Sequence, residues 1–256
     1  MTNTKNNNPW YTEEAGLFSE WYFELFGGKI GDERTSEHCN FLEKTLSLKK
    51  GGKILDLCCG HGRITNEMAE RGYNMTGQDI NNYFMGIAKK KAEELKLIIR
   101  WIKSDMREIP FKDEFDAVVN MFTSFGYFEK DEENEKVIKE INKSLKKGGK
   151  FIIDISNRDF VIRRYRFEDV MGIKNGYVSI NRNFDHIKSS HAETMDIYIN
   201  GEFVKRLNLY YRFYSVSELT DMLSRNGFKV ISFYGGFNFI PLSFETNRCI
   251  ILAEKI

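Results

Sequence analysis

The feature that most constrains the fold is an apolar run that ends in a glycine turn. Residues 53–59 read KILDLCC, and Gly60-His61-Gly62 follows directly. A helical pattern then continues to about residue 71, so the chain passes from a buried strand through a tight turn into a helix. This order is typical of sheets whose parallel strands are buried on both faces.

Strand-like and helix-like segments then alternate as far as residue 155. Apolar runs predict strands at 73–78, 97–102, 115–121 and 150–155, and amphipathic patterns predict helices at 36–48, 82–95 and 132–145. Gly148-Gly149 ends the last of these helices. The strict alternation predicts an α/β fold built on a Rossmann-like, doubly wound sheet.

The pattern changes after Asn157. Segments 176–184, 191–199 and 202–214 predict antiparallel strands, with Asn200-Gly201 as a two-residue hairpin turn. They form a β-hairpin lid inserted beyond the strand ends, where open α/β sheets bind ligands. A helix at 217–225, with Ser217 as its N-cap, and strands at 228–234 and 248–254 follow. We expect a single domain over 1–256: an N-terminal helical cap (1–50), a cofactor-binding core (51–156), the β lid insertion (157–214) and a C-terminal completion of the sheet (215–256).

Composition limits the class of protein. The formal net charge is +1, so the chain lacks the basic excess of a non-specific nucleic-acid binder, and we expect no nucleic-acid partner. No apolar run approaches roughly 18 residues and the N-terminal residues lack an apolar signal core, so we expect a cytoplasmic protein without membrane contact. Four cysteines without metal-ligand spacing predict free thiols and no metal. The aromatic residues after residue 175 offer a surface through which two copies could form a homodimer.

Three acids lie at or near the ends of three successive predicted strands. Asp56 lies inside the first strand, Asp79 ends the second, and Asp105 follows the third with Met106 beside it. An acid at the position of Asp79 reaches the hydroxyls of a bound ribose. Asp56 would repel a pyrophosphate but attract an ammonium group, while Asp105 can accept from an adenine amino group and Met106 can pack on the ring. The ligand that fits is a nucleoside with a cationic tail, such as S-adenosylmethionine.

The same residues resemble a known family, the class I S-adenosylmethionine-dependent methyltransferases. The resemblance rests on LDLCCGHGR (55–63), TGQDI (76–80), SDMREIPF (104–111), FDAVVNMFTSFGYF (115–128) and LKKGGKFIIDISNR (145–158). It implies S-adenosyl-L-methionine as cofactor and a seven-stranded sheet whose last strand is antiparallel. Within the family the chain most resembles the glycine N-methyltransferase-like, small-molecule branch.

The resemblance also implies roles for individual residues. In that branch an Arg ahead of the first strand binds the cofactor carboxylate, which corresponds to Arg34, and an Asn contacts the acceptor, which corresponds to Asn157. The loosely aligned N-terminal stretch leaves open which of Tyr11, Trp21 and Tyr22 reaches the cofactor. The predicted cofactor-binding set is Arg34, Asp56, Cys58, Gly60, His61, Gly62, Asp79, Ile80, Asp105, Met106, Asn120 and Met121. The predicted substrate contacts are Tyr127, Asn157 and Arg158.

Methyl transfer is an in-line displacement that depends mainly on alignment, and the sequence points to no catalytic residue. We expect a small-molecule acceptor, methylated at nitrogen or oxygen; a hydroxyl would need a base, for which Tyr127, His186 and His191 are candidates. One alternative is methylation of RNA or protein, for which the arginines at 163, 164 and 166 could bind phosphates. The other is a dinucleotide-dependent oxidoreductase, which Asp56 and the missing third glycine disfavour.

Overall fold

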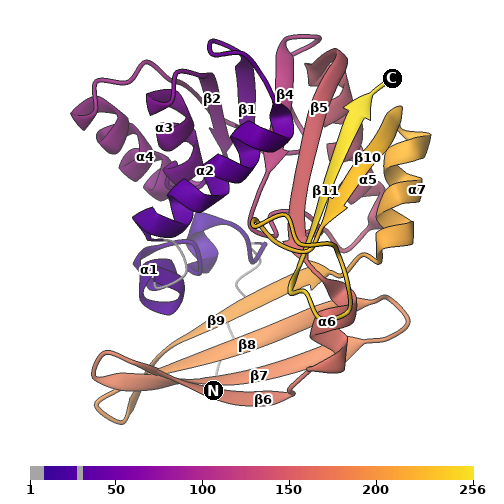
Figure 1. The fold of residues 1–256 in the computed structure, drawn as a ribbon. Helices are drawn as coiled ribbons and strands as arrows, with labels where there is room; N and C mark the ends of the chain where they lie inside the picture. Colours follow the sequence, from indigo (N-terminus) through magenta and orange to yellow (C-terminus); the bar gives the residue numbers. More distant parts are fainter. Residues whose placement is uncertain (1–8, 28–30) are drawn as a thin grey trace.

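The computed structural model describes residues 9–27 and 31–256, and it contains two separate sheets (Figure 1). The larger sheet has seven strands in the order β10-β11-β5-β4-β1-β2-β3, and the smaller has four in the order β6-β7-β8-β9. Strand β11 pairs antiparallel to β5, while β1, β2, β3, β4 and β5 run parallel. The predicted Rossmann-like fold, with its antiparallel last strand and antiparallel hairpin sheet, is confirmed.

The parallel half follows the predicted alternation. Its strands are β1 (Lys53–Leu57), β2 (Asn74–Asp79), β3 (Arg100–Lys103), β4 (Phe115–Asn120) and β5 (Leu145–Ser156), and its helices are α2 (Asp32–Leu46), α3 (Arg63–Glu70), α4 (Asn82–Glu94) and α5 (Asp131–Ser144). Strand β5 starts five residues earlier than the predicted residue 150, because Leu145 already pairs with Phe115 on β4. The glycine pair at 148–149 therefore lies inside the strand rather than before it.

Two cores cover the faces of this sheet. On one face Ile54 packs with α2 and α3 through Phe41, Leu42 and Met68. The other face carries Leu55 and Leu57, which pack against α5 and against α7 (Val216–Arg225). Because neighbouring strand residues point to opposite faces and Ile54, Leu55 and Leu57 are all buried, β1 needs a helical layer on each side (Figure 1).

The C-terminal part completes the sheet with β10 (Phe228–Tyr234) and β11 (Arg248–Lys255). Helix α7 begins one residue before the predicted start. Its N-cap is Ser215, not the predicted Ser217, since Ser215 and Glu218 form a reciprocal capping box. That box satisfies two backbone donors at once, which a cap at Ser217 would not do.

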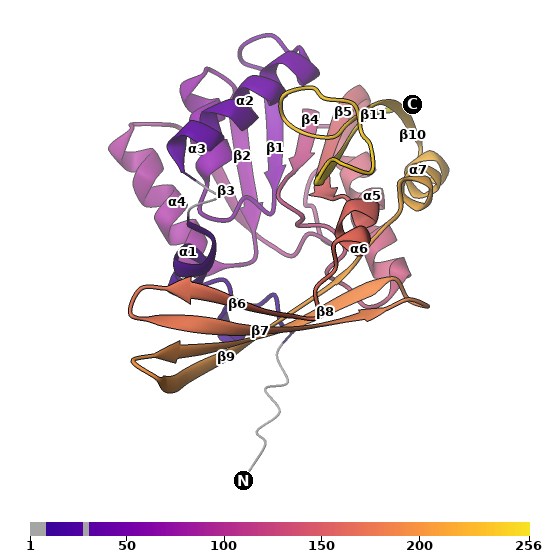
Figure 2. The same cartoon turned by 60° about the horizontal axis from the view of Figure 1, so that its bottom comes forward.

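The lid region forms the antiparallel sheet of β6 (Glu168–Ile173), β7 (Gly176–Asp185), β8 (Ser190–Ile199) and β9 (Glu202–Arg212). Strand β6 and the short helix α6 (Arg158–Arg163) were not predicted, because each is too short to show a clear period. Figure 2 shows this sheet lying across one end of the larger one. Its outer face exposes Val170 and Tyr177; a homodimer through the lid remains a prediction.

The N-terminal residues connect the two sheets. Helix α1 (Glu20–Phe26), the preceding 3-10 turn η1 (Glu13–Ala15) and the residues around them pack on the antiparallel sheet, with Leu17 and Leu25 buried among Val178, Ile197 and their neighbours. Trp21 also packs there. In the described part of the chain no helix is long and apolar enough to span a membrane.

Candidate active site

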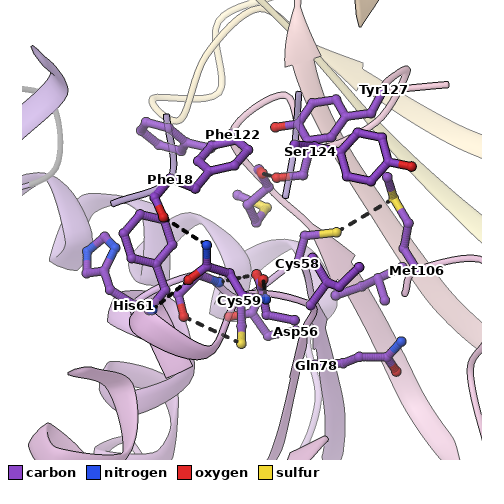
Figure 3. Close-up of a pocket in the computed structure, with 18 of the residues that line it drawn as sticks. Phe18, Asp56, Cys58, Cys59, His61, Gln78, Met106, Phe122, Ser124 and Tyr127 are labelled. Carbon is purple, nitrogen blue, oxygen red and sulfur yellow. Dashed lines mark hydrogen bonds between the residues drawn. The ribbon is translucent and has the colours of Figure 1, made fainter. Parts of the chain in front are cut away.

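A pocket lies where β1 and β4 are neighbours in the larger sheet. From this pair the strand order runs through β2 and β3 on one side and through β5 on the other, so it is the point where open α/β sheets bind ligands. The pocket encloses about 1040 Å³ of space, part of it open to solvent. Figure 3 shows Phe122, Ser124 and Tyr127 at one side of it and Asp56 and Gln78 at the other.

The structure brings most of the predicted site residues to this pocket. All three predicted acids line it, and so do the following other members of the predicted sets: Cys58, Gly60, His61, Ile80, Met106, Met121 and Tyr127. Arg34, Gly62, Asn120, Asn157 and Arg158 do not line it.

Asp56 is the most deeply buried of the three acids. Its carboxylate is 2% exposed and accepts a hydrogen bond from the Thr65 hydroxyl at 2.6 Å. Burial raises its pKa to about 6, and the hydrogen bond from Thr65 and the charge of Arg63 only partly oppose this. The site therefore holds a carboxylate for which a cationic ligand group would be a favourable partner.

Asp79 fixes the glycine turn. Its Oδ2 accepts from the backbone N–H of Gly60 at 2.8 Å and its Oδ1 from that of Asn81 at 2.9 Å. Burial raises its pKa, whereas these backbone donors lower it. Asp79 thus ties the end of β2 to the turn after β1, and both elements meet at the pocket.

Asp105 lines the pocket, but a neighbour engages both of its carboxylate oxygens. Arg107 donates to Oδ1 from its backbone N–H at 2.8 Å and to Oδ2 from Nη2 at 2.6 Å. Arg107 also lies over the Phe128 ring, 4.1 Å from its centroid. The carboxylate predicted to meet an adenine amino group therefore has an arginine partner of its own, which the sequence analysis did not foresee.

Half-buried Arg63 lines the pocket, whereas the predicted Arg34 does not. Arg34 lies exposed on α2, away from the pocket lining. The guanidinium of Arg63 lies 2.9 Å from Nδ1 of His38 and 3.4 Å from the Thr35 hydroxyl. Burial lowers the pKa of Arg63, and in the described residues no carboxylate is within ion-pair distance of it.

Arg63 was missed although it follows the glycine turn directly. Its place in the pocket depends on α2, which supplies Thr35 and His38 from far along the chain. Burial, together with the charge of Arg63, lowers the pKa of His38 to about 3, so this imidazole is neutral and can accept the arginine's hydrogen bond.

Within the glycine turn, Gly60 and Gly62 have different tasks. Gly60 lines the pocket and donates its N–H to Asp79. Gly62 has φ +78°, and a Cβ there would lie 2.6 Å from Cβ of Ala88 on α4. It is therefore a helix-packing residue rather than a pocket residue, since only glycine lets α3 and α4 approach so closely.

Aromatic side chains close the pocket on the side of the N-terminal residues. Tyr11, Phe18 and Tyr22 line it together with Tyr127, and Trp21 does not. Phe18 stacks on Tyr127 with centroids 6.2 Å apart, and the Phe18 carbonyl accepts from Asn81 at 2.8 Å. Of the three N-terminal aromatic residues that the sequence offers for contact with the cofactor, Tyr11 and Tyr22 thus lie at the pocket.

Comparison with known proteins identifies the family. A family model described as a methyltransferase domain matches residues 54–149. Over 248 residues the chain is 27% identical to YqeM of Bacillus subtilis (strain 168), whose name as a methyltransferase is provisional; the match covers 93% of this chain and 96% of that protein. Residues 54–149 therefore form a methyltransferase domain. A protein with such a domain is an enzyme, and solved structures that share its fold include S-adenosylmethionine-dependent methyltransferases, one of them with that cofactor bound.

Further comparisons agree with this methyltransferase family. A relative from the predicted branch is the glycine/sarcosine N-methyltransferase of Aphanothece halophytica, 26% identical over 162 residues that cover 60% of this chain and 61% of that enzyme. An S-adenosylmethionine-dependent methyltransferase from Clostridium acetobutylicum ATCC 824 has the same fold, with a TM-score of 0.78 at 18% identity over 92% of this chain and 96% of that one. The oxidoreductase alternative is therefore set aside.

Three residues predicted to contact ligands have structural partners in this methyltransferase. Asn120 is buried and donates to the Leu57 carbonyl at 3.0 Å, joining β4 to β1. The amide of Asn157 donates to the carbonyls of Ser243 and Thr246 at 2.8 and 2.7 Å. Arg158 bonds to Ser189 and Asp159. These side chains hold the surroundings of the methyltransferase pocket.

The base candidates lie apart from the pocket except for Tyr127. His186 is exposed, and His191 is buried in the antiparallel sheet, where its Nδ1 lies 2.8 Å from the Tyr165 hydroxyl. Burial raises the pKa of Tyr127 well above its ordinary value. In residues 9–27 and 31–256 no group of three or more metal-ligating side chains occurs.

Proposed function

We propose that this methyltransferase acts on a nitrogen or oxygen atom of a small molecule bound in the aromatic-walled pocket. The observation that carries the proposal is that buried Asp56 and half-buried Asp79 and Arg63 line the same pocket. A ligand with a ribose and with an amino acid tail presents hydroxyls, an ammonium and a carboxylate, and each has a counterpart there. When bound, S-adenosylmethionine supplies an electrophilic methyl group on a positively charged sulfur.

Each side chain then has a binding or positioning task. Asp79 accepts from the ribose hydroxyls, Asp56 faces the ammonium, and the guanidinium of Arg63 binds the carboxylate. Met106 and Phe128 form an apolar slot at the adenine end. These contacts fix the donor so that the acceptor atom, methyl carbon and sulfur can lie in line.

The pocket favours a neutral amine over a hydroxyl acceptor. An amine nitrogen has a free lone pair once it is neutral, and apolar aromatic walls disfavour its protonated form. A hydroxyl would need a base, but burial raises the pKa of Tyr127, and it lowers the pKa of His61 to about 4. Neither group is poised to take a proton near neutral pH.

Macromolecular acceptors are less well matched by the surface. Arg163 and Arg164, which could have bound phosphates, both donate to the carboxylate of Glu245 at 2.6 Å. Their charges are therefore partly neutralised within the chain. We accordingly propose a small-molecule partner, and a cytoplasmic location remains a prediction.

A cofactor titration tests the assignment of Arg63. Arg63→Met keeps an apolar stem but removes the guanidinium, and should weaken binding of S-adenosylhomocysteine by about 1.5–3 kcal/mol, or roughly 10- to 100-fold. Arg34→Met is the matched control and should bind as the wild type does. If calorimetry shows the loss of affinity in Arg34→Met and not in Arg63→Met, the carboxylate-binding role belongs to the predicted Arg34.

A methyl-transfer assay tests the acceptor class. With S-adenosylmethionine labelled on its methyl group, panels of small amines and phenols are compared with bulk RNA and protein. We expect label on amines, at a rate that rises with pH as the amine loses its proton. Label on RNA or protein with none on small molecules would contradict the proposal.

A further inference from the structure

Two consecutive residues at the pocket have an unusual backbone conformation. Phe122 and Thr123, which follow β4, have φ values of +63° and +60°. Side chains other than glycine rarely adopt this left-handed region, and a β-branched residue such as Thr123 is especially disfavoured there. Such a turn persists only where the surrounding structure holds it in place.

A buried ion pair holds this turn. Asp154 on β5 is 0% exposed; its Oδ2 accepts from the Phe122 N–H and its backbone carbonyl from the Thr123 N–H, both at 2.9 Å. Arg248 on β11 donates from Nε to Oδ1 of Asp154 at 2.7 Å and from Nη1 to the Thr123 hydroxyl at 3.2 Å. The same hydroxyl accepts from the Ser156 N–H at 3.0 Å. The backbone N–H groups of Phe122 and Thr123 and the Thr123 hydroxyl thus have partners on β5 or β11.

The turn fixes the position of the Phe122 side chain, which lines the pocket. It places the Phe122 ring 4.3 Å from the guanidinium carbon of Arg63, a cation–π contact, with the His38 ring 5.4 Å from Phe122. Arg63 therefore has two kinds of support, hydrogen bonds from α2 on one side and the Phe122 ring on the other. Neither Asp154 nor Arg248 lines the pocket.

We infer that Asp154 and Arg248 are positioning residues that act through Phe122 to hold Arg63 against the carboxylate of the cofactor. The inference rests on the proposed role of Arg63. It assigns a function to a polar pair on β5 and β11, which would otherwise count only as a contribution to folding. Breaking the pair should affect the end of the pocket where Arg63 lies and leave the nucleoside end unchanged.

The test compares two ligands that differ only at that end. S-adenosylhomocysteine carries the amino acid tail, and 5′-methylthioadenosine has the same nucleoside and thioether without it. In Arg248→Met we expect the affinity for S-adenosylhomocysteine to fall about 10-fold, with that for 5′-methylthioadenosine unchanged. Arg248→Lys keeps the charge but lacks the planar guanidinium fork that reaches Asp154 and Thr123 from two nitrogens, so it should show the same selectivity to a smaller extent, and it serves if Arg248→Met does not fold.

A rescue variant separates positioning from stability. Glycine adopts a positive φ without penalty, so Arg248→Met combined with Thr123→Gly should recover much of the lost affinity for S-adenosylhomocysteine. Equal weakening of both ligands, or no rescue, would overturn the inference and leave the pair a folding contact. If the wild-type protein binds neither ligand, the proposed site is refuted. If the wild type binds both ligands but the Arg63 variant shows no selective loss for the ligand with the tail, the role of Arg63 is refuted.

Discussion

Replacing Asp56 with asparagine should raise the stability of the ligand-free protein, relative to the wild type, increasingly as the pH rises toward neutral. Asp56 is 2% exposed, and burial raises its pKa to about 6 from an ordinary value of 3.8. A raised carboxyl pKa means that the folded state binds the proton more tightly than the unfolded state does. The stabilisation is therefore fully present below about pH 4 and is lost as pH rises through about 6.

The size of the effect follows from the two pKa values. Each unit corresponds to about 1.4 kcal/mol, so ionised Asp56 lowers the free energy of unfolding by about 3 kcal/mol above pH 7. About half of this loss has occurred at pH 5, and it grows by about 1.3 kcal/mol between pH 5 and pH 7. Asparagine is neutral throughout, and its amide oxygen can still accept from the Thr65 hydroxyl, which lies 2.6 Å from the carboxylate.

Urea unfolding of both proteins at a series of pH values measures this difference. The added amide donors contribute a cost that does not depend on pH, so the informative quantity is the change in the difference between variant and wild type. From pH 5 to pH 7 we expect the free energy of unfolding of Asp56→Asn, relative to that of the wild type, to rise by about 1.3 kcal/mol. A difference that stays constant over this range would show that Asp56 ionises without penalty and would refute the reasoning.

Two further substitutions test the turn and its partners. Asp79→Ala should weaken S-adenosylhomocysteine binding by about 1–3 kcal/mol in calorimetry, because the ribose and the Gly60 N–H both lose their acceptor; unchanged affinity would show that Asp79 is misassigned. Gly62→Ala should lower the free energy of unfolding by about 2–4 kcal/mol, since its Cβ would meet Ala88 at a left-handed φ. Its control, Gly86→Ala on the open face of α4, should instead raise that free energy by up to about 1 kcal/mol in the same denaturation experiment.

The parallel half of the fold was predictable because its signals are local. The strands from β1 to β4 are short and lie next to turn residues, and their alternation with helices leaves few topologies open. Strand β6 was not predictable in this way. It alternates exposed and half-buried residues over only six positions at the edge of its sheet. None of these residues is fully buried, so the sequence there shows no clear alternation of apolar and polar residues.

The acidic residues of the candidate site were predictable because they lie at or near strand ends. Asp56, Asp79 and Asp105 needed only the rule that parallel strands end at one edge of a sheet. The arginine of the pocket could not be predicted in this way. Arg34 lies ahead of the first strand and Arg63 directly follows the glycine turn, and the sequence alone does not decide between them. Only the packing of α2, which turns His38 inward and leaves Arg34 exposed, distinguishes them.

The charges of the pocket explain why one ligand group alone would not suit it. A ligand with only a carboxylate would pair with Arg63 but leave ionised Asp56 buried without a cation, at a cost in free energy. A ligand with only an ammonium would satisfy Asp56 and leave the guanidinium of Arg63 bonded to neutral partners, His38 and Thr35. A tail that carries both groups satisfies both sites at once, and its ammonium should draw the pKa of Asp56 back toward the ordinary range. Affinity for such a tail should therefore rise with pH through about 6, in the same interval in which the ligand-free protein loses stability.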